Sequence, residues 1–150
     1  MSDTFLHIIP TEPLWVPSAA AADRAIAVLA ELSPDAERIS AERTSQPRFI
    51  HQGSNFESLR CPRCGEALDL GWWGDVMDEA YEGGFTDLAV AMPCCGESAS
   101  LNDVEYDWPA GFACFVLDVA NPARSWLTED ELEVLAEALG HPVRQVMSRV

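Results

Sequence analysis

The stretch Phe112-Ala113-Cys114-Phe115-Val116-Leu117-Asp118-Val119 is apolar at every position except Asp118. Successive side chains of a strand point to opposite faces of a sheet, so a strand exposed on one face alternates apolar and polar residues. A strand covered on both faces is apolar throughout. The stretch therefore predicts the central strand of a sheet, with Cys114 as a small apolar core residue rather than a ligand.

Further elements are predicted on both sides of this strand. Strands are expected at residues 5–9, 88–92 and 104–108, with one or two edge strands within residues 36–51 around the break at Pro47. Residues 143–150 are compatible with either a final strand or a short helix. The sheet is therefore expected to be mostly antiparallel.

Three helices are predicted from periodicity and capping residues. The first covers residues 19–32 after the N-cap Ser18, and the last opens with the capping box Thr128-Glu129-Asp130-Glu131 and ends at Gly140. The second begins near Asp75, carries apolar residues at 76, 77, 80 and 81, and ends at a left-handed cap at Gly83-Gly84. Together these elements predict a single α+β domain over residues 1–150.

Four of the five cysteines lie in two short clusters, Cys61-Pro62-Arg63-Cys64-Gly65 and Cys94-Cys95-Gly96. Four thiolates gathered at two tight turns suit a tetrahedral zinc ion. The proline stiffens the first turn, and each glycine permits the backbone angles that the turn needs. The sequence thus predicts a structural Zn²⁺ bound by Cys61, Cys64, Cys94 and Cys95, within a zinc-binding insert at about residues 57–100.

The first cluster resembles the zinc knuckle (CPxCG) of zinc-ribbon and zinc-knuckle proteins. The second cluster matches that pattern only at Cys95-Gly96, because Met92 occupies the place of the first cysteine. Cys94 would then supply the fourth thiolate from a displaced position, with His51 as the alternative fourth ligand. The resemblance implies a closed site whose ion holds the shape of the protein and does no chemistry.

Two enzymatic alternatives use the same cysteines. An open site with three protein ligands would leave a position for activated water, with Glu66 or Glu97 as the base of a metal-dependent hydrolase. The run Cys61-Pro62-Arg63-Cys64 also resembles the CPxC motif of glutaredoxin-like enzymes, which implies a thiol oxidoreductase. Whether the protein is an enzyme stays open at this point.

The chain is strongly acidic, with 25 acidic and 9 basic residues and a net charge of −16. Such a surface repels phosphate backbones, which argues against nucleic-acid binding. The chain has no lysine, so a P-loop lysine, a Schiff-base lysine and a serine-lysine dyad are excluded. The acidic residues are densest from Glu57 to Asp107, a segment that contains twelve carboxylates and only two basic residues, Arg60 and Arg63.

Aromatic and acidic residues directly follow the first cysteine cluster. The pair Trp72-Trp73 is typical of residues that pack over a small metal core. As the alternative, an exposed aromatic anchor among carboxylates suits the recognition of a basic protein. The sequence therefore favours an acidic protein-binding module, in one form an inhibitor or immunity-type protein for a basic partner such as a nuclease toxin. The expected contact residues are Trp72, Trp73, Asp75, Asp78, Glu79 and Glu82.

Residues 1–10 contain no basic leader, and no segment is apolar over the length needed to cross a bilayer. Cysteines grouped for metal binding, without an export signal, are typical of a reducing compartment. A cytoplasmic protein without a membrane partner is therefore expected.

Overall fold

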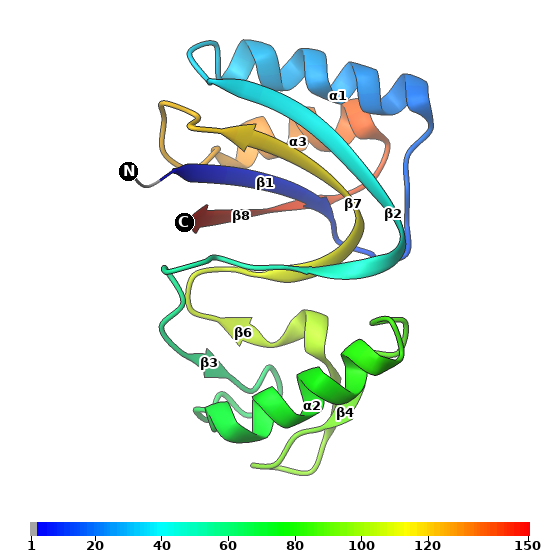
Figure 1. Ribbon diagram of the computed structural model, residues 1–150, viewed down its shortest axis with the longest axis vertical. Helices are drawn as coiled ribbons and strands as arrows, with labels where there is room; N and C mark the ends of the chain where they lie inside the picture. Colours follow the sequence, from blue (N-terminus) through cyan, green and yellow to red (C-terminus); the bar gives the residue numbers. More distant parts are fainter. Residues whose placement is uncertain (1–2) are drawn as a thin grey trace.

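The computed structural model describes residues 3–150, which form an antiparallel sheet with the strand order β2-β7-β1-β8 (Figure 1). The central strand β7 (Gly111–Ala120) pairs with β1 (Thr4–Pro10) on one side and with β2 (Arg38–Ile50) on the other. Nine of its ten residues are buried, which confirms the central strand predicted from the apolar run. The last strand, β8 (Val143–Arg149), pairs with β1 along its whole length, which settles the choice between strand and helix.

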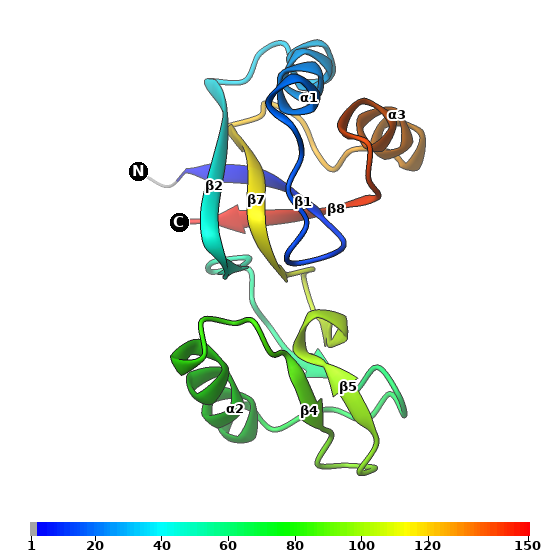
Figure 2. The ribbon, with the colours of Figure 1, turned by 90° about the vertical axis from the view of Figure 1, so that its right-hand side faces the viewer.

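Two helices, α1 (Ala19–Leu32) and α3 (Glu129–Leu139), pack together over one face of this sheet (Figure 2). Leu29 of α1 and Leu135 of α3 meet Phe115 of β7 in a core where all three are fully buried. The predicted caps are present, since Ser18 accepts a hydrogen bond from the Ala21 amide and Thr128 opens a complete capping box.

The edge strand β2 is long and bent. Its register against β7 shifts between Arg43 and Arg48, around Pro47. Of the one or two edge strands predicted in this region, the structure contains one, with a register shift within it. The bend carries the chain from the sheet into a second part of the molecule (Figure 1).

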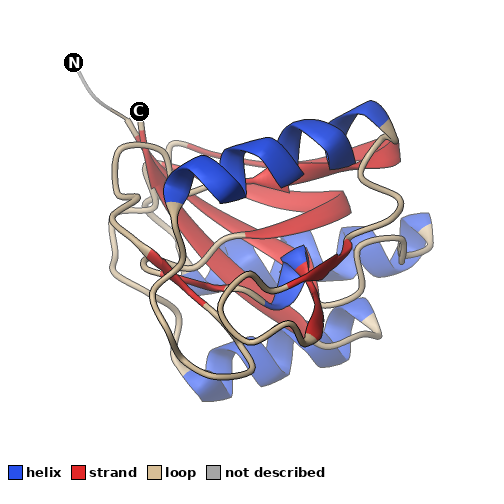
Figure 3. Ribbon diagram, turned by 90° about the horizontal axis from the view of Figure 1, so that it is seen from below, coloured by secondary structure: helices blue, strands red, loops and turns tan. Residues whose placement is uncertain are grey.

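This second part contains residues 51–110, between β2 and β7. It consists of two short strand pairs, one turn of 3-10 helix (η1) and a helix. Figure 3 shows this helix, α2, on the side of the strands opposite α1 and α3. The elements are β3 (Leu59–Arg60) paired with β6 (Glu105–Tyr106), β4 (Ala89–Ala91) paired with β5 (Ser98–Ser100), η1 (Leu101–Asp103) and α2 (Leu70–Glu82).

The buried Asn102 joins the two parts. Its side-chain amide donates to the carbonyl of Thr11 at 3.1 Å, and its side-chain oxygen accepts from the amide of Phe112 at 2.9 Å. Arg144 of β8 donates to its backbone carbonyl at 2.9 Å. Residues 3–150 thus contain three α-helices and a four-stranded antiparallel sheet, which confirms the α+β class with a cysteine cluster in mid-chain. The assignment of residues 1–150 to one domain stays a prediction.

Helix α2 and strand β6 differ most from the predicted helices and strands. Helix α2 begins at Leu70, not near Asp75, because the Asp69 carboxylate accepts the Trp72 amide and caps an earlier turn. Its left-handed residue is Gly84, with φ of 71°, whereas Gly83 has a φ of −87°. The strand expected at residues 104–108 shrinks to β6, because Trp108 adopts a φ of 48° and ends it.

The capping box of α3 predicts a pH dependence of stability. Arg124 binds both carboxylate oxygens of Glu131, at 2.6 and 2.9 Å. This contact, together with the Thr128 amide, lowers the Glu131 pKa to about 2. A lowered folded-state pKa stabilises the protein above the unfolded value of about 4.3, and this contribution is lost as the pH falls toward 2. Glu131→Gln should lack it.

Urea unfolding of the wild type and Glu131→Gln, measured from pH 6 to pH 2, tests this. The difference in stability should be full at pH 6 and should shrink below about pH 4.3. Glu133→Gln, an exposed position on the same helix, is the control and should show no such change. A difference for Glu131→Gln that stays constant down to pH 2 contradicts the assignment.

Candidate metal centre

The first cysteine cluster forms a tight turn after β3. The amide of Cys61 donates to the Glu66 carbonyl at 2.9 Å, and the Gly65 amide donates to the Cys61 carbonyl at 3.0 Å. Gly65 adopts a φ of 78°, in the left-handed region that favours glycine. The amide of Arg63 also donates to the Cys61 sulfur at 3.3 Å. The turn therefore directs backbone N–H groups toward a thiolate.

The second cluster repeats this turn after β4. The Met92 amide donates to the Glu97 carbonyl at 2.9 Å, and the Gly96 amide donates to the Met92 carbonyl at 2.9 Å. Gly96 adopts a φ of 73°. Met92 thus holds the position of Cys61 in the second turn, and Cys95 holds that of Cys64.

The two turns bring four sulfur atoms together. The Sγ atoms of Cys61, Cys64, Cys94 and Cys95 all lie within 4.8 Å of one another. The Cys61–Cys95 and Cys64–Cys94 sulfur distances are 3.9 and 3.3 Å. A zinc ion with Zn–S bonds of about 2.3 Å requires sulfur separations of about 3.8 Å. The donor set therefore fits a metal ion without rearrangement of the backbone.

Cys94, the expected fourth ligand, lies within this cluster. Met92 is buried at 1% exposure and packs in the apolar core of the second part. Cys94, two residues later, is exposed and lies against Cys64. His51, the alternative ligand, is not in the cluster, and its Nδ1 accepts a hydrogen bond from the Gly53 amide at 3.0 Å.

The thiols ionise unequally. Burial opposes ionisation of Cys61, but the amides of Cys64 and Arg63 donate to its sulfur and lower its pKa to about 7. Burial raises the pKa of Cys94 to about 12, and so do the hydrogen bonds that its thiol donates to the neighbouring sulfurs. A metal cation displaces the remaining protons, so metal binding is coupled to proton release.

The two arginines of this region support the turns. Arg63 donates from Nε to the Ser98 carbonyl at 3.1 Å, which ties the first turn to β5. Arg60 donates to the Gly65 carbonyl at 3.3 Å. Among residues 3–150 neither forms an ion pair, so the carboxylates of this region are not neutralised by them.

The expected contact residues on α2 divide into two groups. Asp75, Asp78, Glu79 and Glu82 are exposed, and no cation within residues 3–150 pairs with them. Trp73 is half-buried: its ring stacks on Phe56 at 5.6 Å and meets Phe49 and Tyr106 edge-on. Trp72 is also half-buried against the same core. The tryptophans therefore pack over the second part of the molecule.

Tyr81 is the exposed aromatic residue of α2, with 71% of its surface accessible. The sequence placed it with Val76, Met77 and Ala80 on the apolar stripe, and this assignment is wrong. The stripe faces the core through Met77 and Ala80, whereas Tyr81 contacts Phe85 with one edge only. At the edge of an apolar stripe, residue spacing alone does not distinguish a tyrosine that faces solvent from one that faces the core.

The chain matches no family model, no curated protein and no solved structure. No helix within residues 3–150 is long and apolar enough to cross a membrane. The function is therefore inferred from the residues of the chain itself.

Removal of the fourth thiol tests the metal centre. Cys94→Ser should weaken metal binding strongly, because a hydroxyl is a poorer ligand than a thiolate for a borderline-soft ion. Titration with Co²⁺, followed by its thiolate absorption, measures this. Cys114→Ala removes a thiol from β7 and should bind the metal like the wild type. Equal binding by Cys94→Ser would show that Cys94 is not a ligand.

The repeated turn makes a second prediction. Met92→Cys places a thiol at the position equivalent to Cys61, so the double variant Met92→Cys/Cys94→Ser should recover the metal affinity that Cys94→Ser loses. The same Co²⁺ titration measures the recovery, with Met92→Ser/Cys94→Ser as the matched control. Failure of the cysteine variant to exceed this control contradicts the equivalence of the two turns.

Proposed function

We propose that the protein is an acidic protein-binding module whose shape is held by a structural Zn²⁺, and that its partner is a basic protein. The zinc assignment rests on the donor set, since four thiolates prefer a borderline-soft tetrahedral ion. Cys61, Cys64, Cys94 and Cys95 would fill all four coordination positions, which leaves none for a substrate water. The bound ion would contribute directly to folding stability.

The same geometry argues against the enzymatic alternatives. Glu66 and Glu97 use their backbone carbonyls to close the two turns, and both side chains extend from exposed positions. A thiol oxidoreductase needs one reactive thiol with a resolving partner, whereas here two pairs of thiols converge on one point. The metal centre therefore supports a structural role.

The acidic face of α2 carries the proposal. Asp75, Asp78, Glu79 and Glu82 are spaced i, i+3, i+4 and i+7, which places all four carboxylates on one side of the helix. Each like-charge pair at i, i+4 costs about 0.2–0.5 kcal/mol. Glu79 and Glu82 also lie in the last turn of the helix, where the helix dipole disfavours anions. A basic partner would supply the cations that relieve this repulsion.

The residues beside this face suit an interface. Tyr81 is 71% exposed and Leu70 is 51% exposed, so an aromatic and an aliphatic side chain flank the carboxylates. Tyrosine is among the residues that contribute most to protein interfaces. The net charge of −16 would accelerate the approach of a basic protein. An inhibitor or immunity-type role is the narrower form of the proposal, supported by size and charge.

A charge reversal on this face separates stability from binding. Glu82→Lys removes two like-charge contacts and places a cation in the last turn of α2, so it should stabilise the zinc-loaded protein by about 0.5 kcal/mol. Urea unfolding measures this gain. A loss of stability would instead mean that the Glu82 side chain makes contacts that stabilise the folded protein.

The binding test compares two matched variants. Asp78→Lys/Glu82→Lys on α2 and Glu133→Lys/Glu137→Lys on α3 change the net charge equally, and both pairs are exposed at i, i+4. Each tagged protein is captured from its own cells and weighed by native mass spectrometry. A basic protein bound by the wild type and the α3 variant, but lost by the α2 variant, supports the proposal.

A salt titration with the purified partner, and with lysozyme as a generic basic protein, completes the test. The partner should bind the wild type more tightly than lysozyme does, and α2 reversal should abolish the difference. Equal effects of the two variants, or the absence of any basic partner, contradict the proposal. Zinc content is measured in the same spectra, so loss of the metal is distinguished from loss of the partner.

A further inference from the structure

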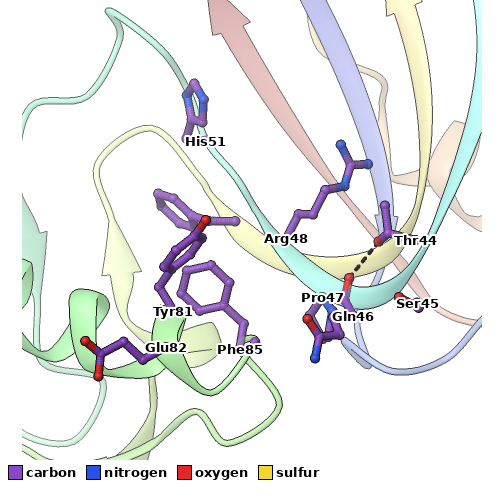
Figure 4. A pocket seen from close by; sticks show the side chains of 11 residues that line it. Thr44, Ser45, Gln46, Pro47, Arg48, His51, Tyr81, Glu82 and Phe85 are labelled. Atoms are coloured by element: carbon purple, nitrogen blue, oxygen red, sulfur yellow. Dashed lines mark hydrogen bonds between the residues drawn. The ribbon is translucent and has the colours of Figure 1, made fainter.

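The face of the sheet that α1 and α3 leave uncovered borders two adjoining cavities. A cavity of about 270 Å³ lies over β1, β7 and β8, and one of about 720 Å³ lies between β2 and the C-terminal end of α2 (Figure 4). Arg48, Phe49 and His51 line both. Because they share these lining residues, we treat the two cavities as one groove. The groove lies apart from the cysteine cluster, and of the four α2 carboxylates only Glu82 lines it.

Arg48, which lines this groove, has an unsatisfied edge that is buried beside it. Its Nη1 lies 3.5 Å from a carboxylate oxygen of Glu42, but its Nε and Nη2 are buried without a hydrogen-bond partner. No other buried side-chain nitrogen or oxygen among the described residues lacks one. Nε–H and Nη2–H are the parallel donor pair with which a guanidinium binds a carboxylate. Because buried donors in proteins are normally paired, this edge lacks an acceptor.

His51 adds a second donor to the groove. Its Nδ1 accepts the Gly53 amide, which leaves the proton of the neutral ring on Nε2. Burial, followed by the charge of His7, lowers the His51 pKa, which favours this neutral form. Arg48 and His51 therefore offer N–H donors and no acceptor.

The remaining polar residues of the smaller cavity are engaged with one another. His7 contacts Asp118 through Nδ1 at 2.5 Å and Ser148 through Nε2 at 2.8 Å. Both ring nitrogens are thus used within the wall of the cavity. The rest of the lining is apolar, from Phe5, Phe49, Ile50, Val116 and Val150.

We propose that this groove binds a small apolar carboxylate, with the carboxylate on Arg48 and the hydrocarbon body on the apolar lining of the smaller cavity. The Nη1 contact with Glu42 is long and both side chains are partly exposed, so it holds the guanidinium weakly. Because these donors are buried, binding would require rotation about the side-chain bonds of Arg48 to turn the pair into the cavity that this residue lines. His51 donates a further hydrogen bond from Nε2.

The chemistry of the groove favours a monocarboxylate over a phosphate. The single guanidinium of the groove matches at most one negative charge. The Asp118 and Glu82 carboxylates that also line the groove, and the net charge of −16, oppose a doubly charged phosphate more than a monoanion. Half of the smaller cavity's lining is apolar, which a hydrated phosphate cannot use. A volume of 270 Å³ equals that of about nine liquid waters, enough for a benzoate-sized molecule.

Isothermal titration of the zinc-loaded protein with benzoate, hexanoate, benzyl alcohol and inorganic phosphate tests this proposal. Benzoate or hexanoate should bind with 1:1 stoichiometry, and benzyl alcohol and phosphate should bind at least about tenfold more weakly. Arg48→Gln should weaken carboxylate binding by about tenfold or more. Arg38→Gln, an exposed position on the same strand with the same charge change, is the control and should bind like the wild type.

A second measurement does not depend on the variants folding. The Nε–H resonance of Arg48 in wild-type protein, assigned by its absence in Arg48→Gln or by sequential connectivity, should shift on addition of benzoate and stay unchanged with benzyl alcohol. Binding of phosphate as tight as benzoate, equal loss in both arginine variants, or saturation without a shift of this resonance overturns the proposal. No heat with either carboxylate overturns it as well. These measurements use no protein partner, so their failure is distinguishable from a failure of the proposal for α2.

Discussion

The need to cover both faces of β7 organises the molecule. One face of the strand, through Phe115, Leu117 and Val119, is covered by α1 and α3. Near its start, Phe112 is covered by the second part of the molecule and belongs to the same core as Met92. A fully apolar strand is stable only when nothing on either side is left in water. A metal ion bound at the two cysteine turns would therefore also serve the sheet, because it would hold together the part that covers Phe112.

The second part has little secondary structure of its own. Its paired strands are two or three residues long, and two-stranded ribbons of that length are not stable in water. Its twelve carboxylates also repel one another. Four metal–sulfur bonds can supply the free energy that this region lacks, and Asn102 fixes its orientation against β1 and β7.

The molecule presents two surfaces of opposite chemistry. The outer side of α2 offers carboxylate oxygens, which are acceptors only, whereas the groove offers the N–H groups of Arg48 and His51, which are donors. Each surface leaves groups unpaired within the described residues. A buried unpaired group such as the Arg48 edge costs free energy, whereas the exposed carboxylates of α2 are hydrated and repel one another. The two proposals follow from these two sets of unpaired groups.

Sequence predictions were accurate for helix caps and turns, whose structure depends on a few neighbouring residues. Ser18, Thr128 and the cysteine-glycine turns were predicted because each depends on a few neighbouring residues. The start of α2 was missed, since Gly71 and Gly74 are poor helix formers and hide the cap at Asp69. Tyr81 was misplaced because the edge of an apolar stripe depends on what packs against it.

The sequence by itself determined the α+β class, the central strand and the four thiols that converge on one point. Only the tertiary structure brought His7, Asp118 and Ser148 together, across 111 and 141 residues of chain, and left one edge of Arg48 without an acceptor. The physical reason is the range of the interactions. Caps and turns are decided within a few residues, whereas neighbours on a sheet face are set by strand register, which depends on packing of the whole chain.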